Sequence, residues 1–109
     1  MDLKLNQKRC VPCEGGLEPL KGEKLADFGE SIHGHWIIEG EHHLSREFGF
    51  KDFKEALTFA NSIGEIAEEE GHHPDILVSW GKVGVTIWTH AIDGLSENDF
   101  ILAAKIDEL

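Results

Sequence analysis

Apolar residues recur along this chain with two periods, and the order of these patterns predicts the secondary structure. Spacings of three and four residues, which are typical of amphipathic helices, occur in the ranges 21–31, 52–70 and 96–106. Alternation of apolar and polar residues, which is typical of half-buried strands, occurs in the ranges 36–38, 42–48, 76–80 and 83–87. The resulting order helix, strand, strand, helix, strand, strand, helix predicts an α+β domain, in which a four-stranded antiparallel sheet has its helices packed on one face.

The longest helical pattern begins at Asp52, which forms a variant of the capping box with Glu55 three residues later. Its apolar stripe consists of Phe53, Leu57, Ala60, Ile63 and Ala67, and is widened by Phe59 and Ile66. A stripe of this width indicates that the helix packs on a sheet. Gly71 is the expected left-handed residue after the helix, and Pro74 prevents the chain from returning to helix.

The last two strand patterns flank Gly81-Lys82, a dipeptide that suits a two-residue hairpin turn. A turn at this dipeptide predicts three pairs on the buried face, namely Trp80 with Val83, Val78 with Val85, and Ile76 with Ile87. The same register, continued toward the open end of the hairpin, sets His73 opposite His90 on the other face, with Cβ atoms about 5 Å apart. On that outer face, an exposed Trp88 among apolar neighbours indicates the mouth of a site or a subunit contact.

The residues that we expect to do acid–base chemistry fall between Glu68 and Asp99. A helix that ends at Gly71 places Glu68 one turn behind His72, close enough to orient its imidazole by a hydrogen bond. Imidazole titrates at about pH 6.5, so a group of histidines can hold one proton donor and one proton acceptor at neutral pH. Asp99 also fits position N3 of the last helix, behind Ser96, where an acidic residue is favourable in any protein. The pattern predicts a general acid–base site, for which Asp99 is weaker support than the histidines.

The spacing Glu-x3-His-His-Pro-x5-Trp-x9-His-x8-Asp resembles the signature of the pterin-4a-carbinolamine dehydratases, and the resemblance extends from about Lys21 to Leu109. The residues that carry it are Glu68, His72, His73, Pro74, Trp80, His90 and Asp99. It implies a 4a-hydroxytetrahydrobiopterin dehydratase, which forms quinonoid dihydrobiopterin and water in tetrahydrobiopterin recycling. It also implies that no metal or other cofactor is needed, that the protein is a homodimer or homotetramer, and that it is linked functionally to an aromatic amino acid hydroxylase.

The resemblance implies a catalytic set of His72, His73, His90 and Asp99. Of these, His72 and His90 would exchange protons with the substrate: one protonates the departing 4a hydroxyl while the other accepts the N5 proton. His73 and Glu68 would hold the pterin or tune the imidazoles, and Asp99 would orient a catalytic histidine. The other residues expected to line the pterin pocket are Pro74, Thr89, Ala91 and Ile92.

Two other functions remain open. Relatives of this family in animals also act as dimerisation partners of a transcription factor, so a protein-binding module or a transcriptional coactivator-like role is one alternative. A metal enzyme is the other, because two histidines and a carboxylate can hold iron or zinc. Adjacent strand residues point in opposite directions, so His72 and His73 cannot easily bind one ion, and this disfavours a metal site.

The charge balance limits the partners, since 10 basic residues stand against 21 acidic ones and give a net charge of −11. Such a surface repels the phosphates of nucleic acids and anionic lipids. The sequence has neither an apolar run of the ~20 residues that span a membrane nor a signal-peptide pattern near its start. We therefore expect a cytoplasmic protein that binds neither nucleic acid nor membrane.

The first twenty residues fall outside the resemblance, and we expect a flexible segment, 1–20, before a dehydratase domain, 21–109. In this segment Cys10 and Cys13 form a Cys-x2-Cys pair, which is short of the four ligands of a structural zinc. An incidental pair, a metal site completed by other groups and a redox pair all remain open. The histidines outside the motif are expected at solvated or edge positions; they are His33, His35, His42 and His43.

Overall fold

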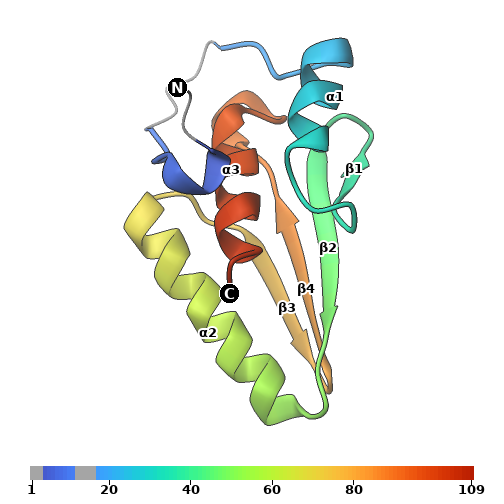
Figure 1. Ribbon diagram of the computed structural model, residues 1–109, viewed down its shortest axis with the longest axis vertical. Helices are drawn as coiled ribbons and strands as arrows, with labels where there is room; N and C mark the ends of the chain where they lie inside the picture. The colour runs from blue at the N-terminus through green and yellow to red at the C-terminus, as the bar shows by residue number, and fades with distance from the viewer. Residues whose placement is uncertain (1–3, 12–16) are drawn as a thin grey trace.

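The protein is described by a computed structural model that covers residues 4–11 and 17–109 (Figure 1). Its helices are η1 (Leu5–Gln7), α1 (Gly22–Glu30), α2 (Phe53–Glu70), η2 (His90–Ile92) and α3 (Glu97–Ile106). Its strands are β1 (Ile37–Glu39), β2 (His43–Gly49), β3 (Asp75–Ser79) and β4 (Lys82–Ile87). The predicted order of α helices and strands is confirmed, and two short 3₁₀ helices, η1 and η2, are added to it. None of the described helices is both long enough and apolar enough to cross a bilayer.

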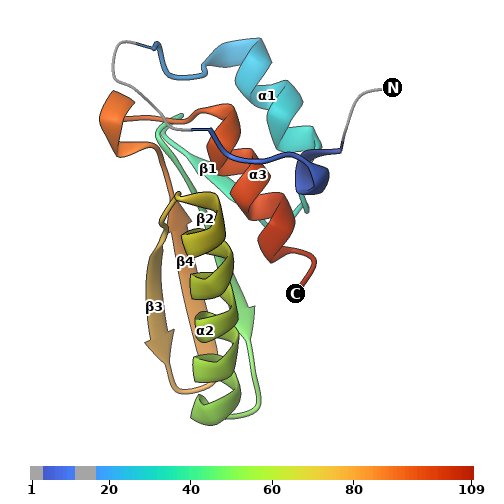
Figure 2. The ribbon, with the colours of Figure 1, turned by 90° about the vertical axis from the view of Figure 1, so that its left-hand side faces the viewer.

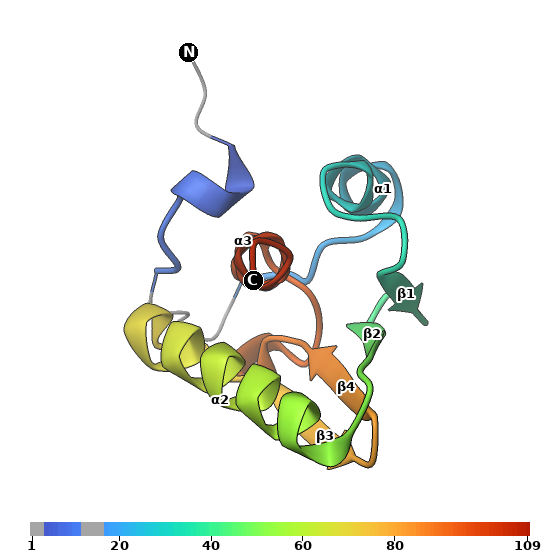
Figure 3. The ribbon, with the colours of Figure 1, turned by 60° about the horizontal axis from the view of Figure 1, so that its bottom comes forward.

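The strands form one antiparallel sheet in the order β1-β2-β4-β3, so β2 and β4 are central. Alternate residues of these two strands are buried on one face, and the most deeply buried are Leu44, Val83, Val85 and Ile87. The helices lie on this side of the sheet, and Figure 3 shows α1 and α3 nearly end-on. The predicted α+β architecture, with its helices on one face of a four-stranded antiparallel sheet, is confirmed.

The helix α2 begins and ends where the sequence predicts. Asp52 Oδ1 accepts the backbone N–H of Glu55 at 2.8 Å, and Gly71 ends the helix with a left-handed φ of 65°. The buried residues of the helix are Ala56, Ala60, Ile63 and Ala67. The predicted stripe is wrong at Phe53 and Leu57, which are 46% and 45% exposed. Ala56, in the same turns, is fully buried, so the buried face of the helix is rotated away from Phe53 and Leu57. The first turns of α2 also lie beyond the end of α3, as Figure 2 shows.

The hairpin of β3 and β4 differs from the prediction by two residues in register. The observed pairs include Ser79 with Lys82, Val78 with Val83, and Ile76 with Val85. The turn is therefore Trp80-Gly81, in which Gly81 adopts a φ of 71° and accepts the Phe50 backbone N–H at 2.8 Å. A shift of two residues keeps the strand side chains on their predicted faces, but it moves Trp80 from the core into the turn, where it is 74% exposed.

The described part of the N-terminal segment packs against the domain. Figure 1 shows η1 beside α3, and Leu20 donates its backbone N–H to Leu95 O at 2.8 Å. Burial, followed by the nearby carboxylate of Glu70, raises the pKa of the Cys10 thiol to about 12. A thiol that stays protonated is a poor nucleophile, which disfavours a redox role for Cys10. Cys13 lies outside the described residues, and the flexibility of residues 1–20 stays a prediction.

Candidate active site

The first group of the site is the imidazole of His72, which follows the turn at the end of α2. Its ring is 12% exposed, and its Nε2 lies 2.6 Å from Oδ1 of Asp99, on α3. An ionised carboxylate only accepts hydrogen bonds, so Nε2 carries the hydrogen and Nδ1 is the ring nitrogen left for a substrate. The end of α2 and the start of α3 thus hold one imidazole in a defined tautomer and orientation.

Asp99 is fully buried, and its second oxygen is held as well as the first. Oδ2 accepts the backbone N–H of Ser96 and the hydroxyl of Thr89, both at 2.8 Å. Because Thr89 has a single hydroxyl hydrogen, its 2.7 Å contact with Ser96 Oγ is donated by Ser96. The capping arrangement of Ser96 and Asp99 is therefore confirmed, and the same carboxylate holds both the helix start and the imidazole of His72.

A closed loop between β4 and α3 brings Thr89 to this carboxylate. After Thr89 the chain passes through η2 and Asp93, whose φ of 49° is left-handed, and Gly94 returns to form an antiparallel bridge with Thr89. Packing requires a glycine at this position, because a Cβ on Gly94 would lie 2.6 Å from Pro19. The loop also places η2 beside His72 at the surface.

His73 lies in a different setting from its neighbour. Its Nε2 is 2.5 Å from Glu68 Oε2, and the two side chains are 61% and 79% exposed. The expected pairing of Glu68 with His72 is therefore wrong, because Glu68 contacts His73 while Asp99 holds His72. Glu68 itself borders a separate, shallow groove along α2.

His90, the first residue of η2, stacks on Trp88. The two rings are nearly parallel, with their centroids 4.2 Å apart and their planes inclined by 13°. The same indole packs against His42 and His43, with centroid distances of 5.5 and 6.2 Å. These two histidines, expected at solvated or edge positions, are partly buried by this contact.

A surface hollow of about 320 Å³ joins these groups. It is lined by Val11, Gly71, His72, His73, Trp88, Thr89, His90 and Ala91. The predicted cross-strand pairing of His73 with His90 is wrong, because the observed register, continued beyond Asp75, sets His73 opposite Trp88. The two histidines still border one hollow, since η2 and not the sheet ladder places His90 there. The volume suits a small ligand.

The sequence model of the pterin 4 alpha carbinolamine dehydratase family matches residues 18–109. The chain belongs to this family. Proteins of Alkaliphilus metalliredigens and Rubrobacter xylanophilus, each named "Putative pterin-4-alpha-carbinolamine dehydratase", are both 53% identical to it. The alignments cover 95% and 96% of this chain, and 94% and 97% of those proteins. They span 104 and 105 of the 109 residues, so the likeness includes most of the N-terminal segment that we expected to lie outside it.

Two solved structures share the fold of this chain. A crystal structure of a transcriptional coactivator/pterin dehydratase from Brucella melitensis matches with a TM-score of 0.75 at 28% identity, and covers 84% of this chain and 97% of that one. A pterin dehydratase-like protein, described as a RuBisCO assembly factor in the alpha-carboxysome, matches with a TM-score of 0.59 at 24% identity over 70% of this chain and 89% of its own. The second likeness concerns the fold alone.

The hollow includes residues that the motif of the family did not point to. The position of Trp88 at the hollow agrees with the prediction that this residue marks the mouth of a site. Gly71 also lines the hollow, although the sequence indicated only that it ends a helix. Val11 carried no signal, because nothing in its local sequence relates it to residues more than fifty positions away. Among the described residues that line the hollow, Thr89 and Ala91 are expected ones, whereas Glu68, Pro74 and Ile92 do not border it. A binding role for Pro74 and Ile92 stays a prediction.

Within residues 4–11 and 17–109, no group of three or more His, Cys, Asp or Glu side chains has an arrangement that could hold a metal ion. The carboxylates of Asp99 and Glu68 each face one imidazole nitrogen, so these pairs meet each other's hydrogen-bonding needs. That this protein needs no metal stays a prediction.

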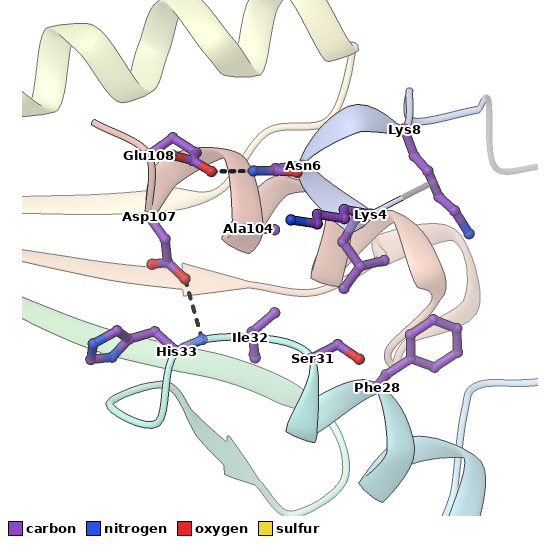
Figure 4. A pocket seen from close by; sticks show the side chains of 11 residues that line it. Lys4, Asn6, Lys8, Phe28, Ser31, Ile32, His33, Ala104, Asp107 and Glu108 are labelled. Atoms are coloured by element: carbon purple, nitrogen blue, oxygen red, sulfur yellow. Dashed lines mark hydrogen bonds between the residues drawn. The ribbon is translucent and has the colours of Figure 1, made fainter. Parts of the chain in front are cut away.

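A larger hollow, of about 570 Å³, lies between η1, α1 and α3, and Figure 4 shows it. Its carboxylate Asp107 already accepts hydrogen bonds from Trp36 Nε1 and Arg46 Nη1, each at 2.8 Å. Its one histidine, His33, is exposed and meets this carboxylate through its backbone N–H at 3.4 Å. The larger hollow therefore lacks converging imidazoles, and the chemistry is assigned to the smaller one.

Proposed function

We propose that this protein dehydrates a 4a-hydroxytetrahydropterin, such as 4a-hydroxytetrahydrobiopterin, to the quinonoid dihydropterin by histidine acid–base catalysis. The observation that carries the proposal is the hollow that His90 shares with His72, whose imidazole is held by the buried Asp99. The reaction expels the 4a hydroxyl as water and removes the N5 proton while the C4a=N5 double bond forms. The N5 lone pair drives the departure, so the chemistry needs one proton donor and one proton acceptor.

His72 takes the accepting role in this proposal. Because its Nε2–H is donated to Asp99, the lone pair of Nδ1 remains available for the N5 proton. The carboxylate then stabilises the imidazolium that forms, and burial of Asp99 limits the screening of this interaction by water. A positioned base of this kind contributes about 10²–10⁴-fold to the rate.

His90 takes the donating role, and protonates the departing hydroxyl. Stacking on Trp88 fixes the plane of the imidazole, while its edge, which carries both ring nitrogens, is left for the ligand. His73, at the exposed side of the hollow, is assigned to holding the pterin, and Glu68, which lies outside the lining of the hollow, is assigned to orienting the His73 ring.

The experiment that tests this proposal is a pterin dehydration assay on two variants. His72→Ala and His90→Ala are each expected to lower turnover about tenfold or more. Tm should change little in His90→Ala, whose ring is exposed, but should fall in His72→Ala, which leaves Oδ1 of the buried Asp99 without its partner. His33→Ala, which removes an exposed histidine outside the hollow, is the control and should keep the wild-type rate. Wild-type rates in either test variant would remove that residue from the mechanism. Failure of the unaltered protein to dehydrate the pterin would refute the function itself.

A chelator separates this mechanism from a metal-assisted one. Protein treated with EDTA should retain its activity, because imidazoles alone carry the protons. The experiment includes a Cys10→Ser, Cys13→Ser variant, so that metal bound at the cysteines is not mistaken for metal at the site. Loss of turnover in this variant on chelation, with recovery on adding iron or zinc, would replace the acid–base mechanism by a metal-assisted one.

Protein binding is a second candidate function, favoured by the exposed apolar residues on the outer face of the sheet. Leu77 on β3 is 71% exposed and Ile37 on β1 is 56% exposed. The related Brucella protein is titled a transcriptional coactivator as well as a pterin dehydratase. Association of two copies of the chain through this face would cover these apolar side chains. Sedimentation of the wild type and of Leu77→Asp tests this, and a monomer in both would oppose it. The hydroxylase link and the cytoplasmic location stay predictions.

A further inference from the structure

We propose that the N-terminal arm, defined as residues Lys4–Val11, forms a wall of the candidate active site. In this proposal, which rests on the proposed function, Val11 contacts the bound pterin and Asn98 is the positioning residue that holds Val11 in place. The assignment concerns a segment that lies outside the catalytic motif and before the part of the chain matched by the family model.

The beginning of the arm is anchored along α3. Leu5 packs against the hydrophobic core, and the side-chain amide of Asn6 donates to the carboxylate of Glu108, as Figure 4 shows. Two residues further along, Lys8 Nζ lies 2.7 Å from Glu97 Oε2, at the start of α3. The arm therefore follows α3 from its end back to its first turn, which is the turn that contains Asp99.

Asn98 then holds the end of the arm through two hydrogen bonds to the backbone of one residue. Its Oδ1 accepts the Val11 N–H at 3.0 Å, and its Nδ2 donates to the Val11 carbonyl at 2.6 Å. Because Asn98 is only 6% exposed, water competes weakly for these bonds. A side chain that pairs with both backbone groups of Val11 fixes the position and the direction of that residue.

A second anchor comes from α2. Glu70, whose side chain is 3% exposed, accepts the backbone N–H of Cys10 at 2.8 Å. Glu70 precedes His72 by two residues, and Asn98 directly precedes Asp99. Both anchors therefore belong to the same two segments that hold the imidazole–carboxylate pair, so the arm and this pair are positioned together.

The side chain of Val11 has the exposure expected of a ligand contact. It is 66% exposed and borders the hollow together with His72 and His90. An exposed isopropyl group contributes little to folding, but it loses contact with water when a flat heterocycle packs against it. Substitution of Val11 should therefore change ligand affinity while leaving the stability of the protein nearly unchanged.

The first test compares Val11→Ala with Leu17→Ala, which removes an equally exposed apolar side chain of the N-terminal segment. Leu17 is 64% exposed. Val11→Ala is expected to raise KM for the carbinolamine about three- to tenfold, with kcat and Tm nearly unchanged. The dissociation constant of 7,8-dihydrobiopterin, used as a stable reduced pterin, should rise by a similar factor. Leu17→Ala should match the wild type. Val11→Ile, which keeps a branched apolar side chain at this position, should also have a KM close to that of the wild type.

The second test concerns Asn98 and does not depend on turnover. In Asn98→Ala, hydrogen exchange at the amide of Val11 should become about tenfold faster or more, while exchange in the central strands stays as in the wild type. The same variant should show the raised KM of Val11→Ala, and the double variant should add little to it. Slow exchange at Val11 in Asn98→Ala would overturn the positioning role.

The outcomes distinguish this inference from the proposed function. If the wild type dehydrates the carbinolamine and Val11→Ala has an unchanged KM and pterin affinity, the wall assignment is wrong and the proposed function stands. If the wild type neither binds nor dehydrates the pterin, the proposed function fails and the wall assignment fails with it. Equal increases in KM in Val11→Ala and Leu17→Ala would also overturn the assignment, because the increase would then not depend on a position at the hollow.

Discussion

His72 and His73 are neighbours in the sequence, and each lies beside a carboxylate, yet the two pairs occupy opposite environments. The pair of His72 and Asp99 has side chains 12% and 0% exposed, whereas the pair of His73 and Glu68 has side chains 61% and 79% exposed. Water and salt screen the exposed pair, so its geometry is weakly held and its contribution to stability is small. The buried pair has a fixed geometry, which is what a catalytic base requires.

The difference between the pairs comes from where their carboxylates lie. Asp99 lies at the start of α3 beneath the end of α2, where Thr89 and Ser96 satisfy its second oxygen. Glu68 lies in the last turn of α2, on its solvent side. A carboxylate that is already held by other groups can orient an imidazole at little entropic cost, while a free one must itself be ordered.

The largest expected effect is that of removing the charge of the buried carboxylate. Asp99→Asn should lower kcat about 10²–10⁴-fold, because an amide cannot stabilise the imidazolium of His72 as a carboxylate does. Glu68→Gln, the matched change in the exposed pair, should lower kcat less than about threefold. Steady-state kinetics on both variants measure the contrast. Equal losses in the two variants would show that burial does not separate the roles of the pairs.

The architecture was predictable because local patterns determine it. The periodicity of the helices and strands, the cap at Asp52 and the left-handed Gly71 all depend on residues close together in the sequence. The convergence of His72 and Asp99 was predictable only through the family motif, since the two residues are 27 positions apart. The capping of α3 by Ser96 and Asp99 gave a local reason for the same carboxylate.

The remaining features depend on contacts that no local pattern encodes. Two overlapping dipeptides, Trp80-Gly81 and Gly81-Lys82, both offered a glycine for the hairpin, and the contact of Gly81 with the backbone of Phe50 accompanies the turn that forms. The place of Val11 depends on Asn98, which is 87 residues away. A polar pair of this kind leaves no periodicity in the sequence.

A smaller effect is expected from loosening the support of the buried carboxylate. Thr89→Val keeps the shape of the side chain but removes the hydroxyl that donates to Asp99 Oδ2. The free energy of unfolding should fall by about 1–3 kcal/mol, and kcat should fall about three- to tenfold as Asp99 becomes less well oriented. Thr86→Val, on the outer face of β4, is the control and should change both quantities little. Wild-type kcat in Thr89→Val would limit the role of this hydroxyl to stability.

Two glutamates at the end of α2 show the same contrast between buried and exposed carboxylates. Glu68 is 79% exposed, whereas Glu70 is 3% exposed and pairs with Lys105 Nζ at 3.2 Å and with Arg9 Nε at 3.4 Å. Acidic residues at a helix C-terminus oppose the helix dipole, and for Glu70 these cations offset that cost. Burial alone would raise the pKa of Glu70, but the Cys10 N–H, Lys105 and Arg9 outweigh it and hold this pKa below its usual value.

The smallest effect on activity, and the clearest dependence on pH, is expected from Glu70→Gln. Because the pKa of Glu70 is lowered on folding, its ionised form stabilises the protein at pH values above the usual glutamate pKa of about 4.3, and this stabilisation is lost as the pH falls through the lowered pKa. Urea unfolding between about pH 7 and pH 3 should therefore show Glu70→Gln as less stable than the wild type near neutrality, with the difference shrinking in acid. Glu68→Gln, the matched change at an exposed carboxylate, is the control and should be about as stable as the wild type near neutrality. If the difference in unfolding free energy between Glu70→Gln and the wild type stayed constant with pH, the side chain would stabilise the end of α2 through its shape and hydrogen bonds, and its charge would contribute nothing to stability.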